Sequence, residues 1–553
     1  MEWSKRKFLL IALALFPLLA GAQVGPDSYI VYFNDKDNTP YSISQPSEFL
    51  SERAIQRRQN QGIAIDSLDL PVDPEYILSV KNLGDVEILH ALKWMNAILI
   101  RTTDPGVLFG LSDLIGFDRL EVSRSLTAYD NLTFKEPVLS KDDADYGPSL
   151  NQIEMLNGLQ LHADGFRGEG MLIAVLDGGF SNATSAAALD SLFDDNRVLA
   201  QYNFVDNNSD VFQHSTHGSY VLSTMASIMK DSIIGTAPKA SYLLALTEDV
   251  SQERRIEEAH WEAAAEYADS AGADVINSSL GYHSFDVIED SYSYSDMDGN
   301  TTLVTRVADI AATRGMLVVT SAGNSGDDEW YYIGAPGDGE KVLSIGAVNS
   351  QGVVTGFSSR GPSFDGRVKP NVMAQGRSTV VSDLGDGIAT TNGTSLSSPV
   401  LAGMAACLWQ ANPGATAAQV FSAIEMSASL FEMPNDSMGY GIPDFEIARQ
   451  LLQNVVSVES PLSPKGRDQM TFYPNPFQGG RVSISIPNLS AGTFQAVILN
   501  LEGKMIFRNS ALSSLSDLER NAEKTFLSAE SGGYIIVVRD AEGHTFTAKV
   551  LLP

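Results

Sequence analysis

The feature that most constrains the fold is a series of short, continuous apolar runs separated by longer Ala-rich segments, between residues 146 and 452. The clearest runs are LIAVL at 172–176, YLLAL at 242–246, MLVVTSA at 316–322 and VLSIGAV at 342–348. An apolar run without polar alternation is typical of a strand buried on both faces, and strands separated by helices form parallel sheets. We therefore expect an α/β domain in which helices cover both faces of a parallel sheet.

The two flanking regions have different patterns. Residues 23–145 mix strand-like and helix-like segments, which predicts a small α+β domain. We expect its strands at 29–33 and 93–101 and its helices at 48–58 and 105–114. Residues 453–468 are rich in Ser and Pro and are interpreted as a linker. Residues 469–553 contain apolar runs punctuated by Gly, Asn and Asp, which predicts a small antiparallel β-sandwich.

The first 22 residues have the pattern of a secretory signal peptide. Lys5, Arg6 and Lys7 precede an apolar run at 8–20, and the small residues at 20–22 form a cleavage site. The run is too short to span a bilayer, which takes about 20 apolar residues, and no later segment is long enough either. The only cysteine, Cys407, excludes an intrachain disulfide, and its apolar neighbours predict a buried core thiol.

The chain is strongly acidic, with a formal net charge of -31 at pH 7. Most of this charge belongs to residues 146–452, while residues 469–553 are neutral overall. Such a surface repels phosphate backbones, so we expect no nucleic-acid partner. It suits a soluble extracellular protein that attracts basic substrates or cations.

Four polar residues follow predicted strands or begin predicted helices. Asp177 ends the run LIAVL, Asn324 follows VVTSA, His217 begins HGSYVLS, and Ser395 precedes a long apolar helix. Functional residues collect at the carboxyl ends of parallel strands, and free N–H groups at a helix start suit an oxyanion. Each residue alone has an ordinary explanation as a turn or cap residue. Together, the order Asp, His, Ser is one of the known orders of a catalytic triad.

Three other kinds of site are less well supported. His214 and His217 could bind a metal, but no carboxylate follows at zinc-hydrolase spacing. The residues around Ser395 lack the final glycine of the G-x-S-x-G esterase motif. Asp296, Asp298 and Asn300 alternate as in a calcium loop, but Gly299 occupies the fourth position rather than the sixth. We assign no metal ligands.

The motifs around the four residues resemble those of the subtilase family of serine proteases. VLDGG at 175–179, HGSYVLS at 217–223, SAGNSG at 321–326 and NGTSLSSPVLAG at 392–403 carry the resemblance. INSSLGY at 276–282 resembles the family's substrate-binding strand, which would place Ser279, Leu280 and Gly281 beside the peptide. One departure is Gln375, where the family usually has proline.

The resemblance implies a serine endopeptidase with Ser395 as nucleophile, His217 as base, Asp177 as its orienting partner and Asn324 as an oxyanion donor. It implies polypeptide substrates, no cofactor for the chemistry, a structural calcium as a family trait and a monomeric zymogen. Residues 23–145 resemble a subtilase propeptide that covers the active cleft. A second hypothesis is a surface-binding protein on a catalytically silent subtilase fold.

The C-terminal region carries a separate resemblance. FYPNPF at 472–477 and the final segment 532–553 are similar to a type A sorting domain of the Bacteroidetes type IX secretion system. This implies the type IX machinery as a partner and a secreted or outer-membrane surface location. The alternative is an accessory β-domain that binds substrate.

Overall fold

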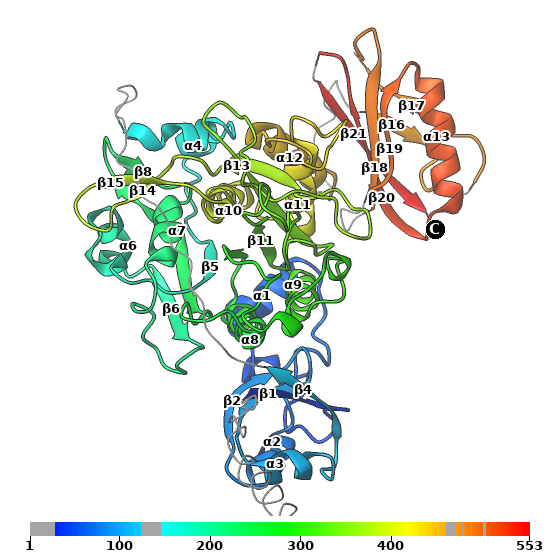
Figure 1. Ribbon diagram of the computed structural model, residues 1–553. Coiled ribbons are helices and arrows are strands. Elements are labelled where there is room, and N and C mark those ends of the chain that lie inside the picture. The colour runs from blue at the N-terminus through cyan, green and yellow to red at the C-terminus, as the bar shows by residue number, and fades with distance from the viewer. Residues whose placement is uncertain are drawn as a thin grey trace, which may run out of the picture.

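The computed structural model describes residues 28–123, 145–459 and 470–552, apart from 478, 488, 501–504 and 543. These residues form an N-terminal domain (28–123), a central domain (145–459) and a C-terminal domain (470–552), which succeed one another from blue to red in Figure 1. The expected signal peptide at 1–22 lies outside the described residues.

The central domain is built on a seven-stranded sheet with the order β13-β12-β11-β10-β5-β9-β6. Every pair of neighbours in it is parallel. In chain order the strands are β5 (Leu172–Asp177), β6 (Val198–Asn203), β9 (Ser241–Leu246), β10 (Val275–Ser278), β11 (Leu317–Ser321), β12 (Val342–Val348) and β13 (Val372–Gln375). The predicted parallel sheet is thereby confirmed.

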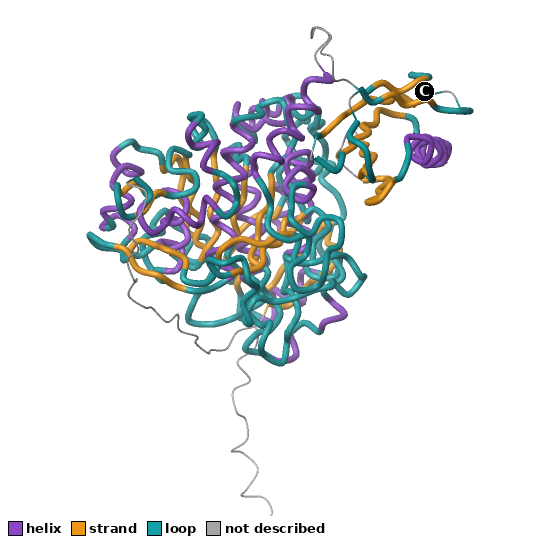
Figure 2. The backbone as a smooth tube through the Cα atoms, turned by 90° about the horizontal axis from the view of Figure 1, so that it is seen from above, coloured by secondary structure: helices purple, strands orange, loops and turns teal. Residues whose placement is uncertain are grey.

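Helices cover both faces of this sheet (Figure 2). The main ones are α7 (His217–Ala226), α8 (Ile256–Ala271), α9 (Leu303–Thr313), α10 (Thr394–Gln410), α11 (Ala417–Met426) and α12 (Phe445–Glu459). Along β5, Ile173 and Val175 belong to the core shared with α7 and α10. Leu172, Ala174 and Leu176 belong to the opposite core, shared with α8 and α9. The continuous apolar run is explained because each face of the strand is buried by a different helix layer.

Shorter elements complete the central domain. They are α4 (Leu150–Glu154), α5 (Leu159–Ala163), α6 (Asp190–Asp194) and the small antiparallel pairs β7 (Ile228–Met229) with β8 (Ile233–Ile234) and β14 (Thr379–Ser382) with β15 (Ile388–Thr391). Helix α12 extends to Glu459, so the prediction that a linker begins at 453 is wrong for its first seven residues. The remainder of that linker, residues 460–468, falls outside the described residues.

The N-terminal domain is the expected α+β unit. Its antiparallel sheet has the order β2-β3-β1-β4. The elements are β1 (Ser28–Phe33), α1 (Glu52–Asn60), α2 (Pro74–Lys81), β2 (Glu87–Leu92), β3 (Ala97–Arg101), α3 (Pro105–Leu111) and β4 (Phe117–Ser123). The strand predicted at 93–101 is instead a turn followed by β3, and Asn96 has a positive φ of 49° in that turn. An asparagine in the left-handed region suits a tight turn between paired strands.

The C-terminal domain is β-rich, as expected, but it also contains a helix that the sequence analysis did not predict. A hairpin of β16 (Thr471–Tyr473) and β17 (Ser483–Ser485) faces a four-stranded sheet of β18 (Phe494–Asn500), β19 (Met505–Leu512), β20 (Gly532–Arg539) and β21 (Thr545–Leu552). Helix α13 (Leu515–Ser528) buries Leu518, Ala522 and Phe526 in this domain's core. The sequence does contain a signal for this helix, because these three residues recur every four positions after Ser514, which caps the helix.

Within the described ranges, no helix combines the length and apolar character needed to cross a membrane.

Candidate active site

Asp177 and His217 meet where a strand ends and a helix begins. The imidazole Nδ1 of His217, the first residue of α7, donates to Asp177 Oδ1 at 2.7 Å. The same carboxylate oxygen accepts the N–H of Gly178 at 2.8 Å. Asp177 is fully buried, and its Oδ2 has no hydrogen-bond partner within the described part of the chain. The carboxylate is therefore held in place mainly to orient the imidazole.

A glycine permits this close approach. At Gly218 an added Cβ would lie 2.6 Å from the Gly179 carbonyl oxygen and 3.0 Å from Asp177 Cβ. The Gly218 N–H donates to that same carbonyl at 3.0 Å. Any larger residue would push the start of α7 away from the end of β5, so the sequence His-Gly is required by the packing.

The carboxylate also changes the basicity of the imidazole. Burial disfavours the charged form of His217, but the charge and hydrogen bond of Asp177 outweigh it, so the pKa of His217 is raised above its ordinary value. Since Nδ1 donates to Asp177, the neutral ring carries its lone pair on Nε2. The arrangement suits a general base that becomes cationic during a reaction.

Ser395 lies in the first turn of α10, where the backbone N–H groups have no partner inside the helix. Its carbonyl accepts a hydrogen bond from Ser279 Oγ at 2.8 Å, just beyond β10. Asn277 Nδ2 donates to Ser279 Oγ at 3.1 Å, and Ser398 Oγ donates to Asn277 Oδ1 at 2.8 Å. These buried hydrogen bonds connect the start of α10 to the sheet and fix the position of Ser395.

Asn324 is oriented by the residue before Ser395. Its side-chain oxygen accepts the Thr394 N–H at 2.8 Å and the Thr394 hydroxyl at 3.0 Å. Because the oxygen is occupied, the amide NH2 is left to donate to another group, and Asn324 is exposed. Thr394 was not among the predicted site residues, and its only signal was its place inside the NGTS motif.

The predicted substrate-binding residues continue from the end of β10 toward this site. Ser279 is buried, Leu280 is half-buried, and Gly281 is exposed. The Leu280 carbonyl accepts from Ser321 Oγ at 3.2 Å, and an added Cβ at Gly281 would meet no atom closer than 3.9 Å. The backbone at Gly281 is therefore open to an incoming chain.

The structure brings Asp177 and His217 into direct contact. It bonds Ser395 to Ser279, and it bonds Asn324 to Thr394, the residue before Ser395. Among the described residues, Ser395 Oγ forms no hydrogen bond with His217. In proteins without bound substrate such catalytic hydrogen bonds are often long. His214, the alternative member of a metal pair, is bound instead to Asp206 at 2.7 Å.

No group of three or more His, Cys, Asp or Glu side chains is placed to hold a metal ion in the described ranges. In the segment that resembles a calcium loop only in part, Asp296 accepts from the Ser293 N–H and Asp298 accepts from the N–H groups of Asn300 and Thr301, so these carboxylates bind their own turns. Cys407 is buried as predicted, and burial raises the pKa of its thiol.

Gln375, which departs from the family pattern, has its own partners. It ends β13, is buried, and accepts a hydrogen bond from Asn151 Nδ2 at 2.7 Å. The substitution therefore joins this strand to α4 rather than altering the four residues of the site.

The sequence profile of the Subtilase family matches residues 168–441, and that of the Peptidase S8 propeptide domain, Bacteroidota, matches residues 28–136. Subtilisin E of Bacillus subtilis (strain 168) is 31% identical over 281 residues, which are 50% of this chain and 65% of that protein. Subtilisin of Bacillus pumilus is 30% identical over 281 residues, which are 50% of this chain and 90% of that protein.

The chain thus belongs to the subtilase family, peptidase family S8, and carries an S8 propeptide domain at its N-terminal side. A further relative, Serine protease AprX of Bacillus subtilis (strain 168), is 34% identical over 136 residues, or 21% of this chain and 30% of that protein. The chain therefore spans less than two thirds of several of the relatives it matches.

Proposed function

We propose that this protein is a secreted serine endopeptidase that hydrolyses peptide bonds through Asp177, His217 and Ser395. The observation that carries the proposal is the 2.7 Å pair of Asp177 and His217 at the strand end, with Ser395 in the first turn of a long buried helix. Subtilase membership and the 30% identity to a subtilisin support it.

In the proposed reaction, Ser395 Oγ attacks the scissile carbonyl carbon while His217 Nε2 takes its proton. The carboxylate of Asp177 stabilises the imidazolium through Nδ1. His217 then gives the proton to the leaving amine, and the acyl-enzyme formed on Ser395 is hydrolysed by water through the same steps. No metal or cofactor takes part in these steps.

The negative oxygen that forms on the attacked carbonyl needs hydrogen-bond donors. We assign this role to the Ser395 N–H and to the Asn324 amide NH2, which Thr394 leaves free to donate. Ser279, Leu280 and Gly281 would align the peptide beside the nucleophile as an added strand, since Gly281 is open on its exposed side.

Ser395→Ala tests the assignment of the nucleophile. We expect the variant to fold normally, to lose peptide hydrolysis and to lose labelling by a fluorophosphonate probe. Ser397→Ala is the matched control, because its hydroxyl is bonded to the Thr394 carbonyl within the helix. Full labelling of Ser395→Ala would refute the proposal, and an unlabelled wild type would favour the silent surface-binding protein.

Asp177→Asn tests the role of the carboxylate. Because the wrong tautomer of His217 would be favoured, kcat should fall by on the order of 10⁴-fold. Since Asp177 is what raises the pKa of His217, the acid limb of the residual activity should also move to lower pH. A pH profile of kcat/KM measures both, and an unchanged acid limb would contradict the assignment.

The remaining domains have proposed roles in export and maturation. We propose that residues 1–22 direct export, that residues 23–145 are removed as a propeptide with a mature N-terminus near 140–150, and that residues 469–553 are read by the type IX machinery for release or surface display. The described residues of the N-terminal domain pack on α8. That residues 23–145 cover the active cleft stays a prediction, and residues 124–144 lie outside the described range. We propose that the protein is a monomer. A bound structural calcium ion is a further prediction, for which no ligands are assigned.

Two experiments test these roles. Amino-terminal sequencing of the active enzyme should begin near 140–150, and an intact residue 23 on active enzyme would refute the propeptide. A chain truncated after residue 468 should accumulate in the periplasm, whereas normal export of that chain would favour the accessory-domain hypothesis.

A further inference from the structure

The four-stranded sheet of the C-terminal domain is apolar on both faces. On β18 and β20, Ala496, Ile498, Ile536 and Val538 face the domain's own core with α13. The alternate residues Val497, Leu499, Ile535 and Val537 face the other way and are also buried, each at 3–6% exposure. A sheet with two apolar faces needs a partner on each face.

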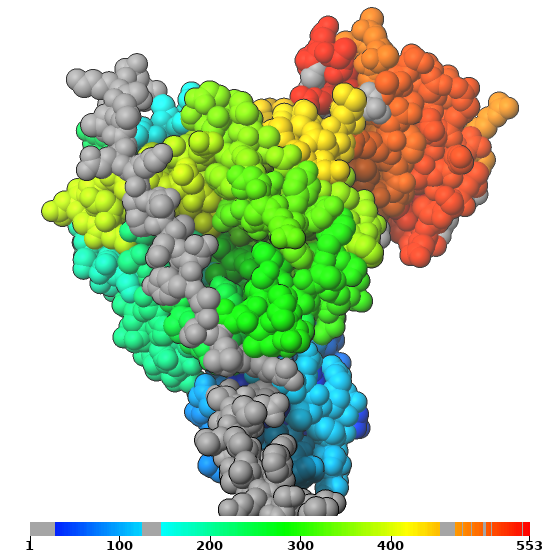
Figure 3. Space-filling model, viewed as in Figure 1, coloured from blue at the N-terminus to red at the C-terminus, as the bar shows by residue number. Residues whose placement is uncertain are grey.

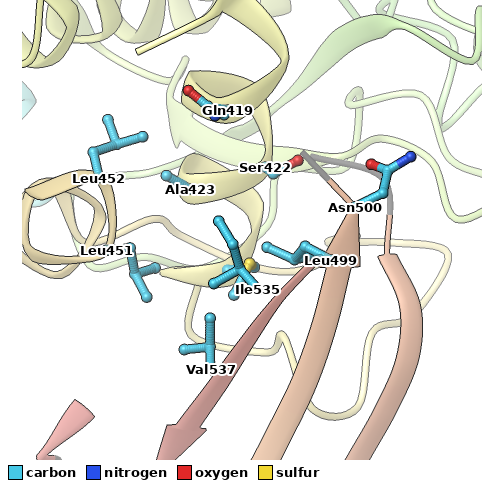
Figure 4. Close-up of a pocket in the computed structure, with 10 residues that line it drawn as sticks. Gln419, Ser422, Ala423, Leu451, Leu452, Leu499, Asn500, Ile535 and Val537 are labelled. Carbon is cyan, nitrogen blue, oxygen red and sulfur yellow. The ribbon is translucent and has the colours of Figure 1, made fainter. Parts of the chain in front are cut away.

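The partner on the second face is the central domain. Ile535 and Val537 belong to the same apolar core as α11 and α12, including Ala423, Leu451 and Leu452. Figure 4 shows these side chains opposite one another across the junction. The cavity between them measures about 20 Å³, which is close to the space needed by a single water molecule. The two domains are in close contact at this patch, and a cleft of about 750 Å³ opens beside it between Leu499, Met505 and α11.

A charged and aromatic contact lies beside this apolar patch. The guanidinium of Arg508 on β19 lies 4.0 Å from the ring centroid of Phe431. Its Nη2 is 3.5 Å from Glu432 Oε2, and both side chains are more than two-thirds buried. Phe431 also packs with Val497 and Leu499. An arginine over an aromatic face in a partly buried place gives the junction a preferred orientation.

We propose that the C-terminal domain is a docked subunit of this enzyme, held noncovalently by the second face of its sheet. Cleavage of the chain between 459 and 470 would therefore leave the domain attached to α11 and α12. Separation would expose Leu499, Ile535 and Val537 together with their partners on the central domain, which water disfavours. The domain carries no net charge, so the strongly acidic central domain does not repel it. The proposal is independent of the catalytic assignment.

The test uses the full chain with Ser395→Ala, so that self-cleavage does not interfere, and with a recognition site for a specific protease inserted within 460–469. After complete cleavage, verified on a denaturing gel, the two fragments should elute together in size-exclusion chromatography at micromolar concentration. Separate elution of the C-terminal fragment would overturn the proposal.

Variants identify the docking face. Val537→Asp places a charge in the apolar junction and should weaken retention by roughly 100-fold. Leu527→Asp, on an exposed position of α13, is the matched control and should retain the domain fully. Release by the control variant as well would mean that retention does not depend on this face and would contradict the proposal.

A charge exchange tests the interface independently, in case Val537→Asp misfolds. Arg508→Glu should weaken retention by about tenfold, because it opposes Glu432. Adding Glu432→Arg should recover part of the loss, which a merely unfolded domain would not do. Equal retention in Arg508→Glu and the wild type, with no change on adding the second substitution, would count against the proposed orientation.

Discussion

The two outer domains both pack on the central domain (Figure 3). Their interfaces differ in how much buried charge they contain. The N-terminal domain uses buried charge: Arg57 and Arg58 of α1 pair with Asp269 of α8, and all three side chains are at most 3% exposed. The C-terminal domain uses aliphatic side chains on α11 and α12. Both interfaces bury apolar side chains, since Tyr32, Leu92 and Trp94 share a core with α8, but among the described residues only the N-terminal one adds a cluster of fully buried ion pairs.

Helix α8 also binds the backbone of the N-terminal domain. Glu266 Oε1 accepts the Trp94 N–H at 2.7 Å, and Glu262 Oε1 accepts the Met95 N–H at 3.1 Å. Lys93 Nζ lies 3.3 Å from Asp269. Burial opposes the charge of Asp269, but the cations around it lower its pKa to about 2.

The two interfaces are expected to respond differently to a loss of charge. A buried ion pair is worth little net stability while both partners are present, but losing one partner or its charge is costly, so such an interface is open to switching. An apolar interface has no equivalent trigger, because burial of carbon does not depend on pH. This agrees with the proposed release of the N-terminal domain and the proposed retention of the C-terminal domain.

The largest expected effect is that of Asp269→Ala on the N-terminal interface. It leaves Arg57 and Arg58 buried without their shared carboxylate, at a cost of about 3–5 kcal/mol. In a Ser395→Ala chain cut within 124–144, retention of the N-terminal domain should fall by at least roughly 100-fold. Arg101→Ala is the control, because its pair with Glu87 is exposed and worth about 0–1 kcal/mol. Equal losses in both variants would break the contrast.

A smaller effect is expected from Phe431→Ala on the C-terminal interface. The variant removes the cation–π contact with Arg508 and part of the apolar patch, which should cost about 2 kcal/mol or roughly 30-fold in retention. Retention of the N-terminal domain in the same chain should not change. Size-exclusion chromatography of the cut chain measures both, and a change at both interfaces would indicate a general loss of folding.

The smallest effect is the pH dependence of the N-terminal interface. Burial, partly offset by Lys93, raises the pKa of Glu266 from 4.5 to about 7. A carboxyl group with a raised pKa takes up a proton on docking, so its contribution to affinity is fully present below pH 4.5 and is lost as the pH rises through about 7. His90, whose pKa is lowered by burial, opposes this trend below about 6.5.

We therefore expect roughly tenfold weaker retention of the N-terminal domain at pH 8 than at pH 6, and no pH dependence for the C-terminal domain. Glu266→Gln should flatten the profile, because glutamine stays neutral throughout. An unchanged profile in that variant would place the titrating group elsewhere, and equal pH dependence at both interfaces would break the comparison.

Most of the candidate site could be predicted from local sequence. A residue that ends an apolar strand, or that begins a helix, is placed by the geometry of a parallel sheet, so Asp177, His217, Asn324 and Ser395 were each expected at the edge where they lie. Thr394 and Asn277 were not predicted. Their roles depend on contacts between β10, β11 and α10, which are distant in the sequence.

The sequence by itself determined the buried strands of the central sheet that carry the site, the helix starts at His217 and near Ser395, and the glycine beside His217, because these follow from apolar periodicity and from steric limits on the backbone. Only the tertiary structure decided which apolar faces meet. The segments QAVILNL and YIIVV form strands that are apolar on both faces. The sequence does not show whether the second face of these strands packs on a helix of the same domain or of another domain. In this protein the second face packs on α11 and α12, because shape and burial, which arise only in the folded chain, select the partner.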